Sequence, residues 1–308
     1  MKTENQYKNV SGSKFAIYFI FTIIMTFIAL IITIVSVVRT AVTRENIYEF
    51  IKNTDYLTIK VADPNGYELT VNEMICSEFI TDELHQNSIY QIIDQTGIEN
   101  IASDYIYSYA SFVLYGSVLD ELTPRKVIKL FNKNIPKIEE GLGKKLIPED
   151  IQNVENAVNA QKSLFDKFSE DGIKNYFGGL LGIIRFVFSA IGIIVFAVFA
   201  ASLLILCSFA AKNPHIPMRI TGIILLTISS PSIIILFLIV SGNFIVDISA
   251  LTPASIIFQS AGGIFVPPCL KVMEYVMSAG VILILVSEIL KTVIKSKTET
   301  ETPELASV

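Results

Sequence analysis

The stretch Phe15–Val38 reads FAIYFIFTIIMTFIALIITIVSVV and carries no acidic or basic side chain. As a helix, a run of this length would extend roughly 36 Å at 1.5 Å per residue, which exceeds a hydrocarbon core of about 30 Å. The run is too long for the apolar part of a signal peptide, and Arg39 stands where cleavage would need a small residue. The stretch therefore predicts an uncleaved helix that spans a membrane.

Composition divides the rest of the chain into two kinds of region. With 52% hydrophobic residues and a mean hydropathy of +0.56, the 308 residues are too apolar for one water-soluble domain, yet 17% charged residues are too many for a wholly intramembrane protein. A mixed-charge region runs from Arg39 to about Tyr176, and the chain is then almost wholly apolar up to Glu288. The pattern predicts an all-α membrane protein with a mostly helical, water-soluble domain between the first and second spans.

Three later apolar stretches complete four predicted transmembrane helices. The stretch 177–211 holds a single charge, Arg185, and is expected to form one long helix that includes the second span, while the only charge in 241–270 is Asp247. The predicted order is a cytoplasmic N-terminus 1–14, span 15–38, extracytoplasmic helical domain 39–176, long helix 177–211, cytoplasmic loop 212–219, span 220–240, apolar outer loop 241–270, span 271–290 and cytoplasmic tail 291–308.

Lysine and arginine near the spans predict their orientation. Cations gather before the first span, between the second and third spans, and after the fourth, at Lys2, Lys8, Lys14, Lys212, Arg219, Lys291, Lys295 and Lys297. Positive residues close to a span favour the cytoplasmic side, so both termini are expected inside. No glycosylation sequon is found in the outer region, which favours a multi-pass protein of a bacterial plasma membrane. The polar tail is expected to be disordered.

Local signals predict several elements of the outer domain. Thr43 can cap a helix from about Arg44 to Lys52, and Ile98–Tyr115 has helical spacing of apolar residues. Thr123 and Pro124 suit the start of a helix that ends by Gly141, and Pro148 suits the start of another that runs to about Ser169.

A hairpin is expected in the first part of this domain. The turn-forming quartet 63–66 separates Leu57–Val61 from Tyr67–Val71. The capping-box pattern of Thr70 and Glu73 then predicts that a helix follows.

The stripe of Ile98, Ile101, Tyr105, Tyr109 and Phe112 allows two interpretations. Exposed tyrosines can form a platform for carbohydrate or peptide, whereas tyrosines in a core bury their rings and leave the hydroxyls near the surface. We expect this stripe to be core.

Small residues in the second span indicate a close helix contact. Gly178 with Gly182, and Ala197 with Ala201, have the four-residue spacing that allows helices to approach closely. We expect this span to pack centrally or at an oligomer contact.

Three charges lie near the predicted outer ends of the spans. Arg185, Asp247 and Glu274 would be costly there without partners. An ion pair of Arg185 with Glu274 would tie the second span to the fourth. The alternatives are that these side chains reach the headgroup layer, or that they serve transport or gating.

Two further features are expected, one within the third span and one at the inner interface of the fourth. Ser230 and Pro231 predict a helix kink in the third span, where serine hydroxyls or a neighbouring helix could satisfy the carbonyl that the proline frees. Glu288 and Lys291 have the spacing of a helix-surface pair.

The charges of the outer domain are segregated. Between Ala62 and Thr123 the chain has eleven acids and no lysine or arginine, whereas Pro124–Lys145 has seven cations. The acidic segment 62–123 could bind a divalent cation or a basic partner. Alternatively the two segments screen each other, or the cations face anionic lipid headgroups.

The residues give no catalytic, cofactor or metal site. Only His85 and His215 are present, and no catalytic, phosphate-binding or calcium-binding motif is found. Cys76 and Cys269 could pair or remain free thiols, and Cys207 falls within the second span. A net charge of −5 argues against a nucleic-acid partner, because phosphate binding needs a basic patch. We therefore expect no enzyme and no cofactor.

Three short stretches and the overall layout carry a resemblance. Val37–Thr40, Asn46–Ile51 and the run from Leu122 to Asn134 are similar to uncharacterised four-span membrane proteins of low-GC Gram-positive bacteria with a helical outer domain. That group implies the fold but no activity. The layout is also similar to the permease subunit of the cell-division ABC system. Lys212–Pro217, however, contains two prolines and is too short for the helix that couples such a subunit to an ATPase.

The predicted function is the binding or sensing of a cell-envelope partner by the outer domain of a protein anchored in the lipid bilayer. A homo-oligomer is a further expected partner. The alternatives are a small oligomeric channel or transporter, and a permease-type partner of an ABC ATPase.

Overall fold

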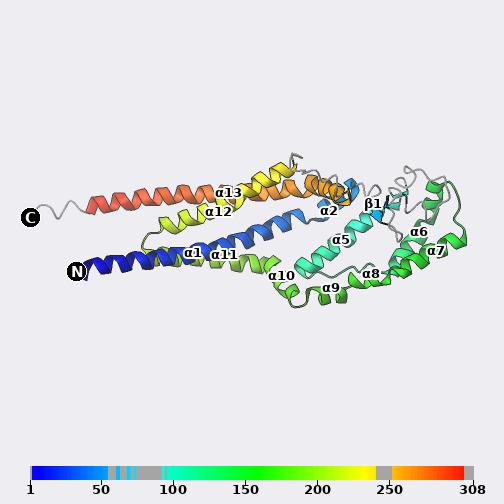
Figure 1. The fold of residues 1–308 in the computed structure, drawn as a ribbon, viewed down its shortest axis with the longest axis horizontal. Helices are drawn as coiled ribbons and strands as arrows, with labels where there is room; N and C mark the ends of the chain where they lie inside the picture. The colour runs from blue at the N-terminus through cyan, green and yellow to red at the C-terminus, as the bar shows by residue number, and fades with distance from the viewer. Residues whose placement is uncertain are drawn as a thin grey trace, which may run out of the picture. The chain divides into compact units, whose positions relative to one another are not determined.

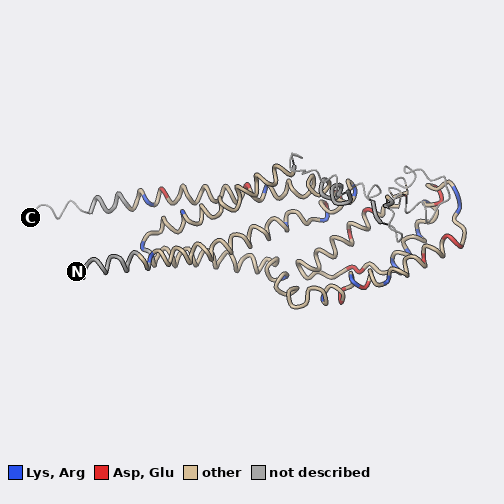
Figure 2. Tube along the Cα trace, in the orientation of Figure 1, with Lys and Arg blue, Asp and Glu red and all other residues tan. Residues whose placement is uncertain are grey.

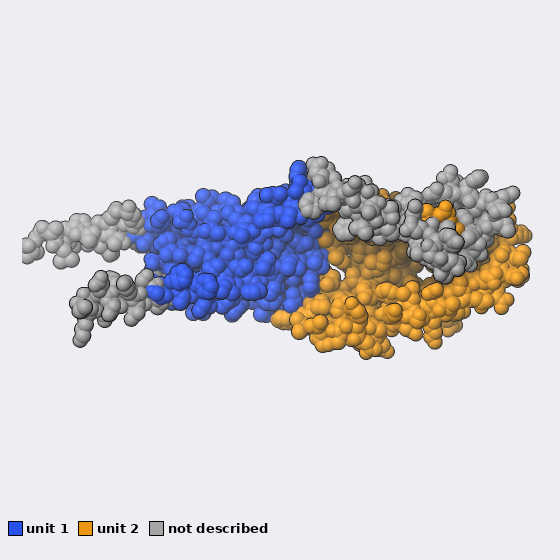
Figure 3. Space-filling model, viewed as in Figure 1, with its two compact units in different colours: residues 1–40, 187–242, 267–308 blue, residues 41–186, 243–266 orange. Residues whose placement is uncertain are grey.

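The structure is a computed structural model and describes residues 2–54, 60–62, 68–70, 73, 92–93, 96–240 and 252–301. Helices dominate these residues, together with one short two-stranded sheet (Figure 1). The chain divides into two compact units (Figure 3). Unit 1 comprises residues 1–40, 187–242 and 267–308, and unit 2 comprises residues 41–186 and 243–266.

The described residues contain four helices that are long and apolar enough to cross a membrane. The span-length segments are Lys14–Ala41, Ala190–Ala210, His215–Ile239 and Ser260–Ile294. The prediction of four such helices is confirmed, and they indicate a multi-pass membrane protein. Along α1, α11 and α12 charged residues lie mainly near the ends, whereas they recur throughout the helices of unit 2 (Figure 2).

Unit 1 is a bundle of α1 (Lys2–Ala41), α11 (Ala190–Ala211), α12 (His215–Val240) and the later part of α13 (Thr252–Glu301). Its core joins the first three of these helices through Phe21, Met25, Ile28, Ala29, Cys207 and Ile224. Large apolar side chains on the outer faces of the bundle stay exposed, which suits helices whose solvent is lipid.

Helices α12 and α13 approach each other backbone to backbone. A Cβ atom placed on Gly222 would lie 2.7 Å from the carbonyl oxygen of Gly280, and one on Gly280 would lie 2.9 Å from that of Gly222. Only glycine fits at both positions. Gly178 and Gly182 make no such contact within the chain, because a Cβ atom on either would meet no described atom within 4 Å, and an oligomer contact there stays a prediction.

Unit 2 begins with α2 (Arg44–Asn53), which starts as predicted. The Thr43 hydroxyl accepts a hydrogen bond from the backbone N–H of Asn46 at 3.1 Å. An ion pair of Arg44 with Asp104 joins α2 to α5 (Ile98–Tyr115), whose bounds match the predicted helix. On α13, Phe265 packs its ring at 5.4 Å from that of Phe50.

The predicted hairpin is confirmed as two short antiparallel strands, β1 (Lys60–Ala62) and β2 (Glu68–Thr70), paired Lys60 with Thr70. The capping box is also present. The N–H of Thr70 donates to the Glu73 carboxylate at 2.7 Å, and the N–H of Glu73 donates to the Thr70 hydroxyl at 3.1 Å. Between Glu73 and Thr96 the structure describes only positions 92 and 93, so the helix expected after the capping box falls largely outside the described residues.

The remaining helices of unit 2 are α6 (Pro124–Leu142), α7 (Pro148–Ala160), α8 (Lys162–Lys167), α9 (Glu170–Phe177) and α10 (Leu180–Phe188). Thr123 caps α6 as predicted, and this helix continues through Pro136 to a left-handed cap at Gly143, two residues beyond the predicted end. The single helix expected from Pro148 to Ser169 is instead broken at Gln161 and Phe168.

One predicted helix is broken where the sequence suggested continuity. The expectation of a continuous helix over 177–211 is wrong, because Gly178 adopts a φ of 52° and Ser189 starts a new helix. The Ser189 hydroxyl accepts from the N–H of Gly192 at 2.9 Å, and this cap competes with continuation of α10. The second span-length helix therefore begins after Ser189.

Two predicted loops are shorter than expected. Helix α12 starts at His215, so only 212–214 of the predicted loop 212–219 is non-helical. Pro217 lies in the first turn of α12, where a missing N–H costs no hydrogen bond. Helix α13 runs without a break from Thr252 to Glu301, so the apolar segment 241–270 is helical from Thr252 onward, and the expectation of a disordered tail from residue 291 is wrong for the described residues.

Candidate functional site

Arg185 anchors α10 to the C-terminus of α5. Its Nε and Nη2 atoms both donate to the carbonyl oxygen of Phe112, at 3.1 and 3.0 Å, and its guanidinium lies 4.4 Å from the centre of the Phe112 ring. The last carbonyls of a helix lack partners within the helix and carry partial negative charge, so a cation is favourable there. The arrangement makes Arg185 the side-chain cap of α5.

The glycine that ends α5 leaves space for the side chain of Arg185. Gly116 follows the helix with a φ of +70°, and its N–H also donates to the Phe112 carbonyl at 3.1 Å. A Cβ atom on Gly116 would lie 3.3 Å from Cδ of Arg185. Glycine is favoured here both by the left-handed backbone and by the close approach of the arginine.

The predicted pair of Arg185 with Glu274 stays a prediction. Arg185 belongs to unit 2, where its hydrogen-bond partner is Phe112, and Glu274 belongs to unit 1. The third charge of that group, Asp247, lies outside the described residues.

Pro231 lies inside α12, which continues through it to Val240. The carbonyl that Pro231 deprives of a donor is that of Thr227. Of the alternatives for satisfying it, the hydroxyls of Ser229 and Ser232 donate elsewhere, to the carbonyls of Leu225 and Ile228 at 2.8 Å. Ser230 is exposed. The kink and the channel alternative stay predictions, and no contact of the described residues favours a polar pathway here.

A polar junction joins the start of α12 to α13. The hydroxyl of Ser287, which is fully buried, donates to the carbonyl of His215 at 2.9 Å. Glu288 pairs with Arg219 at 3.3 Å and with Lys291 at 3.7 Å. The predicted Glu288–Lys291 pair is confirmed, while the two links to α12 were not predicted.

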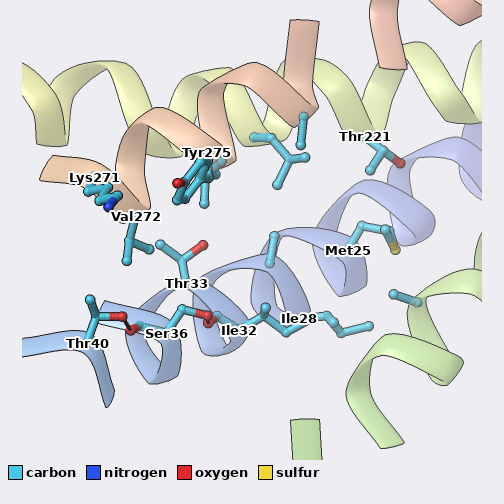
Figure 4. A pocket seen from close by; sticks show the side chains of 15 residues that line it. Met25, Ile28, Ile32, Thr33, Ser36, Thr40, Thr221, Lys271, Val272 and Tyr275 are labelled. Carbon is cyan, nitrogen blue, oxygen red and sulfur yellow. Dashed lines mark hydrogen bonds between the residues drawn. The ribbon is translucent and has the colours of Figure 1, made fainter. Parts of the chain in front are cut away.

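A cavity of unit 1 lies between α1 and α13, with contributions from α11 and α12 (Figure 4). It has a volume of about 730 Å³, within the range of small-molecule sites. One part of the lining is apolar and includes Met25, Ile28 and Leu225. This cavity is called the bundle pocket below.

The other part of the bundle pocket is polar. Thr33, Ser36 and Thr40 of α1 line it together with Lys271 and Tyr275 of α13, and Figure 4 shows these side chains between the two helices. No motif in the sequence predicted this site. The recurrence of hydroxyls at positions 33, 36 and 40, which share one face of a helix, was the signal that could have found its α1 side.

Unit 2 carries a second candidate site, called the aromatic groove below. It consists of two adjoining cavities of about 390 and 660 Å³ that share Tyr109 and Phe168. Tyr105 lines the first cavity and Tyr176 lines the second. The rings of Tyr109 and Phe168 meet edge to face at 5.7 Å. Phe112 is core as predicted, and Tyr109 packs against that core while it also lines the groove. Tyr105 lines the groove.

Charged groups flank the aromatic groove. Lys126 forms an ion pair with Asp120 at 2.5 Å and lies 5.7 Å from the ring centre of Tyr105. The hydrogen bond to Asp120 raises the pKa of Lys126 above its ordinary value. Likewise, the hydrogen bond to Glu170 raises the pKa of Lys174. The Asp120–Lys126 pair supports the interpretation that the acidic and basic segments screen each other where they meet in the sequence. Most of the acidic residues from 63 to 91 lie outside the described residues, so their partners are not described.

The described residues contain no group of three or more histidine, cysteine, aspartate or glutamate side chains that could hold a metal ion. Cys207 and Cys269 are free thiols, and Cys76 lies outside the described residues. The expectation that the protein is not an enzyme stays a prediction.

Comparison of the chain with models of protein families, with curated protein sequences and with solved structures finds no match. The resemblance to four-span proteins of Gram-positive bacteria therefore stays an expectation.

Proposed function

We propose that this protein is a non-enzymatic receptor of a bacterial plasma membrane that binds a cell-envelope protein through the aromatic groove of unit 2. In this proposal both termini are cytoplasmic and unit 2 lies outside the cell. The single observation that carries the proposal is the exposure of the groove's aromatic rings. Tyr176 is 84% exposed and Phe168 is 48% exposed, and both line the cavity that also reaches the buried Ile173.

Exposed aromatic rings around a concave surface suit a protein partner. Aromatic side chains bury a large area and lose little conformational entropy on binding, and so they are enriched at interfaces. Asp166 also lines the groove and forms no ion pair among the described residues. An apolar segment with a neighbouring basic residue would match these groups.

The connections of unit 2 support a mechanical output. Helix α1 leads into unit 2 through the Thr43 cap, and α10 leads out of it through the Ser189 cap. Arg185 ties α10 to α5, which carries Tyr105 and Tyr109 of the groove. A partner that displaces α5 would therefore pull on α10 and on the span-length helix that follows it.

Site-specific photocrosslinking in intact cells tests this proposal. A photoreactive residue replaces Tyr176 in the groove and, in a separate strain, replaces exposed Asn156 on α7 as the control. We expect a discrete adduct with an envelope protein from position 176 and none from position 156.

A second substitution links the adduct to the groove. Adding Phe168→Ala to the position 176 strain should reduce the adduct by about tenfold, because truncation of an aromatic anchor typically costs more than 1 kcal/mol of binding. Equal adducts from positions 176 and 156, or an adduct indifferent to Phe168→Ala, would exclude the groove as the binding surface.

A further inference from the structure

We propose that the bundle pocket is a binding site for one anionic phospholipid, with an acyl chain among its apolar residues and the phosphate at Lys271. The proposal concerns unit 1 alone and does not depend on the function proposed for unit 2. It commits to a lipid of the leaflet at the C-terminal end of α1.

The pocket changes character along α1. Its lining on this helix passes from Met25 and Ile28 to Thr33, Ser36 and Thr40. The distance from position 25 to position 40 of a helix is roughly 22 Å. This distance is close to the thickness of one leaflet with its headgroup layer, which is half of the bilayer's total of about 40–45 Å. An apolar end followed by a polar end over this length matches a lipid in its normal orientation.

Lys271 supplies charge complementarity. It lines the polar end of the pocket and is exposed, and it forms no ion pair with any described carboxylate. Glu274 is one turn further along α13 and does not line the pocket. The polar end of the pocket includes residues of the last turns of α1, which ends at Ala41. Arg39 lies in the last turn of this helix. A cation at this depth can reach the phosphate layer while its aliphatic stem lies on apolar surface.

Thr33 adds an independent observation. Its residue surface is only 3% exposed, and it lines the pocket. The hydroxyls of Ser36 and Thr40 donate to the helix carbonyls of Ile32 and Ser36, each at 2.7 Å, but that of Thr33 forms no hydrogen bond with a described residue. The Thr33 hydroxyl is open to the pocket and can bind an oxygen atom of a ligand there. The ester or glycerol oxygens below a lipid phosphate would satisfy it.

Native mass spectrometry of the full-length protein in detergent tests the proposal, with phosphatidylglycerol and phosphatidylcholine added in parallel. We expect one tightly bound phosphatidylglycerol per chain and weaker binding of phosphatidylcholine. Lys271→Gln should weaken phosphatidylglycerol binding by about tenfold and leave phosphatidylcholine unchanged, since only the anionic lipid gains a charge-assisted hydrogen bond. Lys291→Gln removes a cation from the same helix outside the pocket and should have no effect.

A second pair of variants tests the acyl-chain part. Ala279 is exposed and lines the pocket, so Ala279→Phe should fill it and abolish retention of both lipids. Ala197 is exposed on α11 and does not line the pocket, so Ala197→Phe should retain them. Lipid retention that is unchanged by both Lys271→Gln and Ala279→Phe would overturn the proposal. The lipid proposal would also be overturned if the protein formed a dimer without bound lipid and Ala279→Phe disrupted that dimer. A second copy of the chain would then cover the pocket.

Discussion

At the scale of single residues, Arg185 has the clearest structural role. Its guanidinium donates two hydrogen bonds to the carbonyl of Phe112 at the C-terminal end of α5. We expect Arg185→Ala to destabilise the end of α5 by about 2 kcal/mol, since hydrogen bonds from charged groups contribute about 1.5–3 kcal/mol. Hydrogen exchange of the Gly116 amide, which donates to the same carbonyl, should become up to about 30-fold faster.

Two variants control this measurement. Arg185→Lys keeps a cation at the helix end but loses the paired donors, and we expect an intermediate effect of about 1 kcal/mol. Arg125 is exposed on α6, and Arg125→Ala should leave exchange at Gly116 unchanged. If Arg185→Ala also leaves that exchange unchanged, Arg185 does not cap α5.

The ion pair of Lys126 with Asp120 gives a prediction for pH dependence. Because the folded pKa of Lys126 is raised, its contribution to stability is fully present below the unfolded pKa of about 10.4 and is lost as pH rises through the folded pKa. Both side chains are largely exposed, so the contribution should be only about 0.5 kcal/mol. Denaturation of wild type and Asp120→Asn should show this difference at pH 8 and a shrinking difference above pH 10.5. A difference that persists at higher pH would have another cause.

At the scale of elements, the contact of α12 with α13 depends on two glycines. Gly222→Ala would put a Cβ atom 2.7 Å from a backbone oxygen that cannot move without displacing the helix. We expect it to lower the free energy of unfolding in detergent by about 1–3 kcal/mol, the usual cost of overpacking. Gly263→Ala, on α13 where no described atom lies within 4 Å, should not destabilise. Equal stability of the two variants would show that the helices can separate without cost.

The breaks between α8, α9, α10 and α11 show why element boundaries were harder to predict than elements. Apolar content favoured one helix over 177–211, but it does not distinguish continuation from a restart with a serine cap. Ser189 could continue a helix or cap the start of a new one. Which of the two forms depends on whether the backbone N–H groups that follow it bond to helix carbonyls or to the serine hydroxyl. Pro267 and Pro268 lie inside α13, where the chain passes from one unit to the other.

At the scale of the whole molecule, the orientation in the membrane is the prediction on which the proposed function depends. In a Cys207→Ser, Cys269→Ser background only Cys76 remains. A membrane-impermeant thiol reagent should label Cys76 in intact cells, after denaturation of the outer domain where needed, because the cationic flanks hold the termini inside. Labelling only after lysis would invert the orientation and remove the proposed receptor role.

The sequence by itself determined the four span-length helices, the helix starts at Thr43 and Thr123, the bounds of α5 and the hairpin. These follow from hydropathy, capping and turn chemistry, which act over a few neighbouring residues. Only the tertiary structure decided that Arg185 caps α5, that Gly222 meets Gly280, and that Thr33 and Lys271 share a pocket. Each of these pairs residues far apart in the chain, and local patterns carry no information about which distant surfaces pack together.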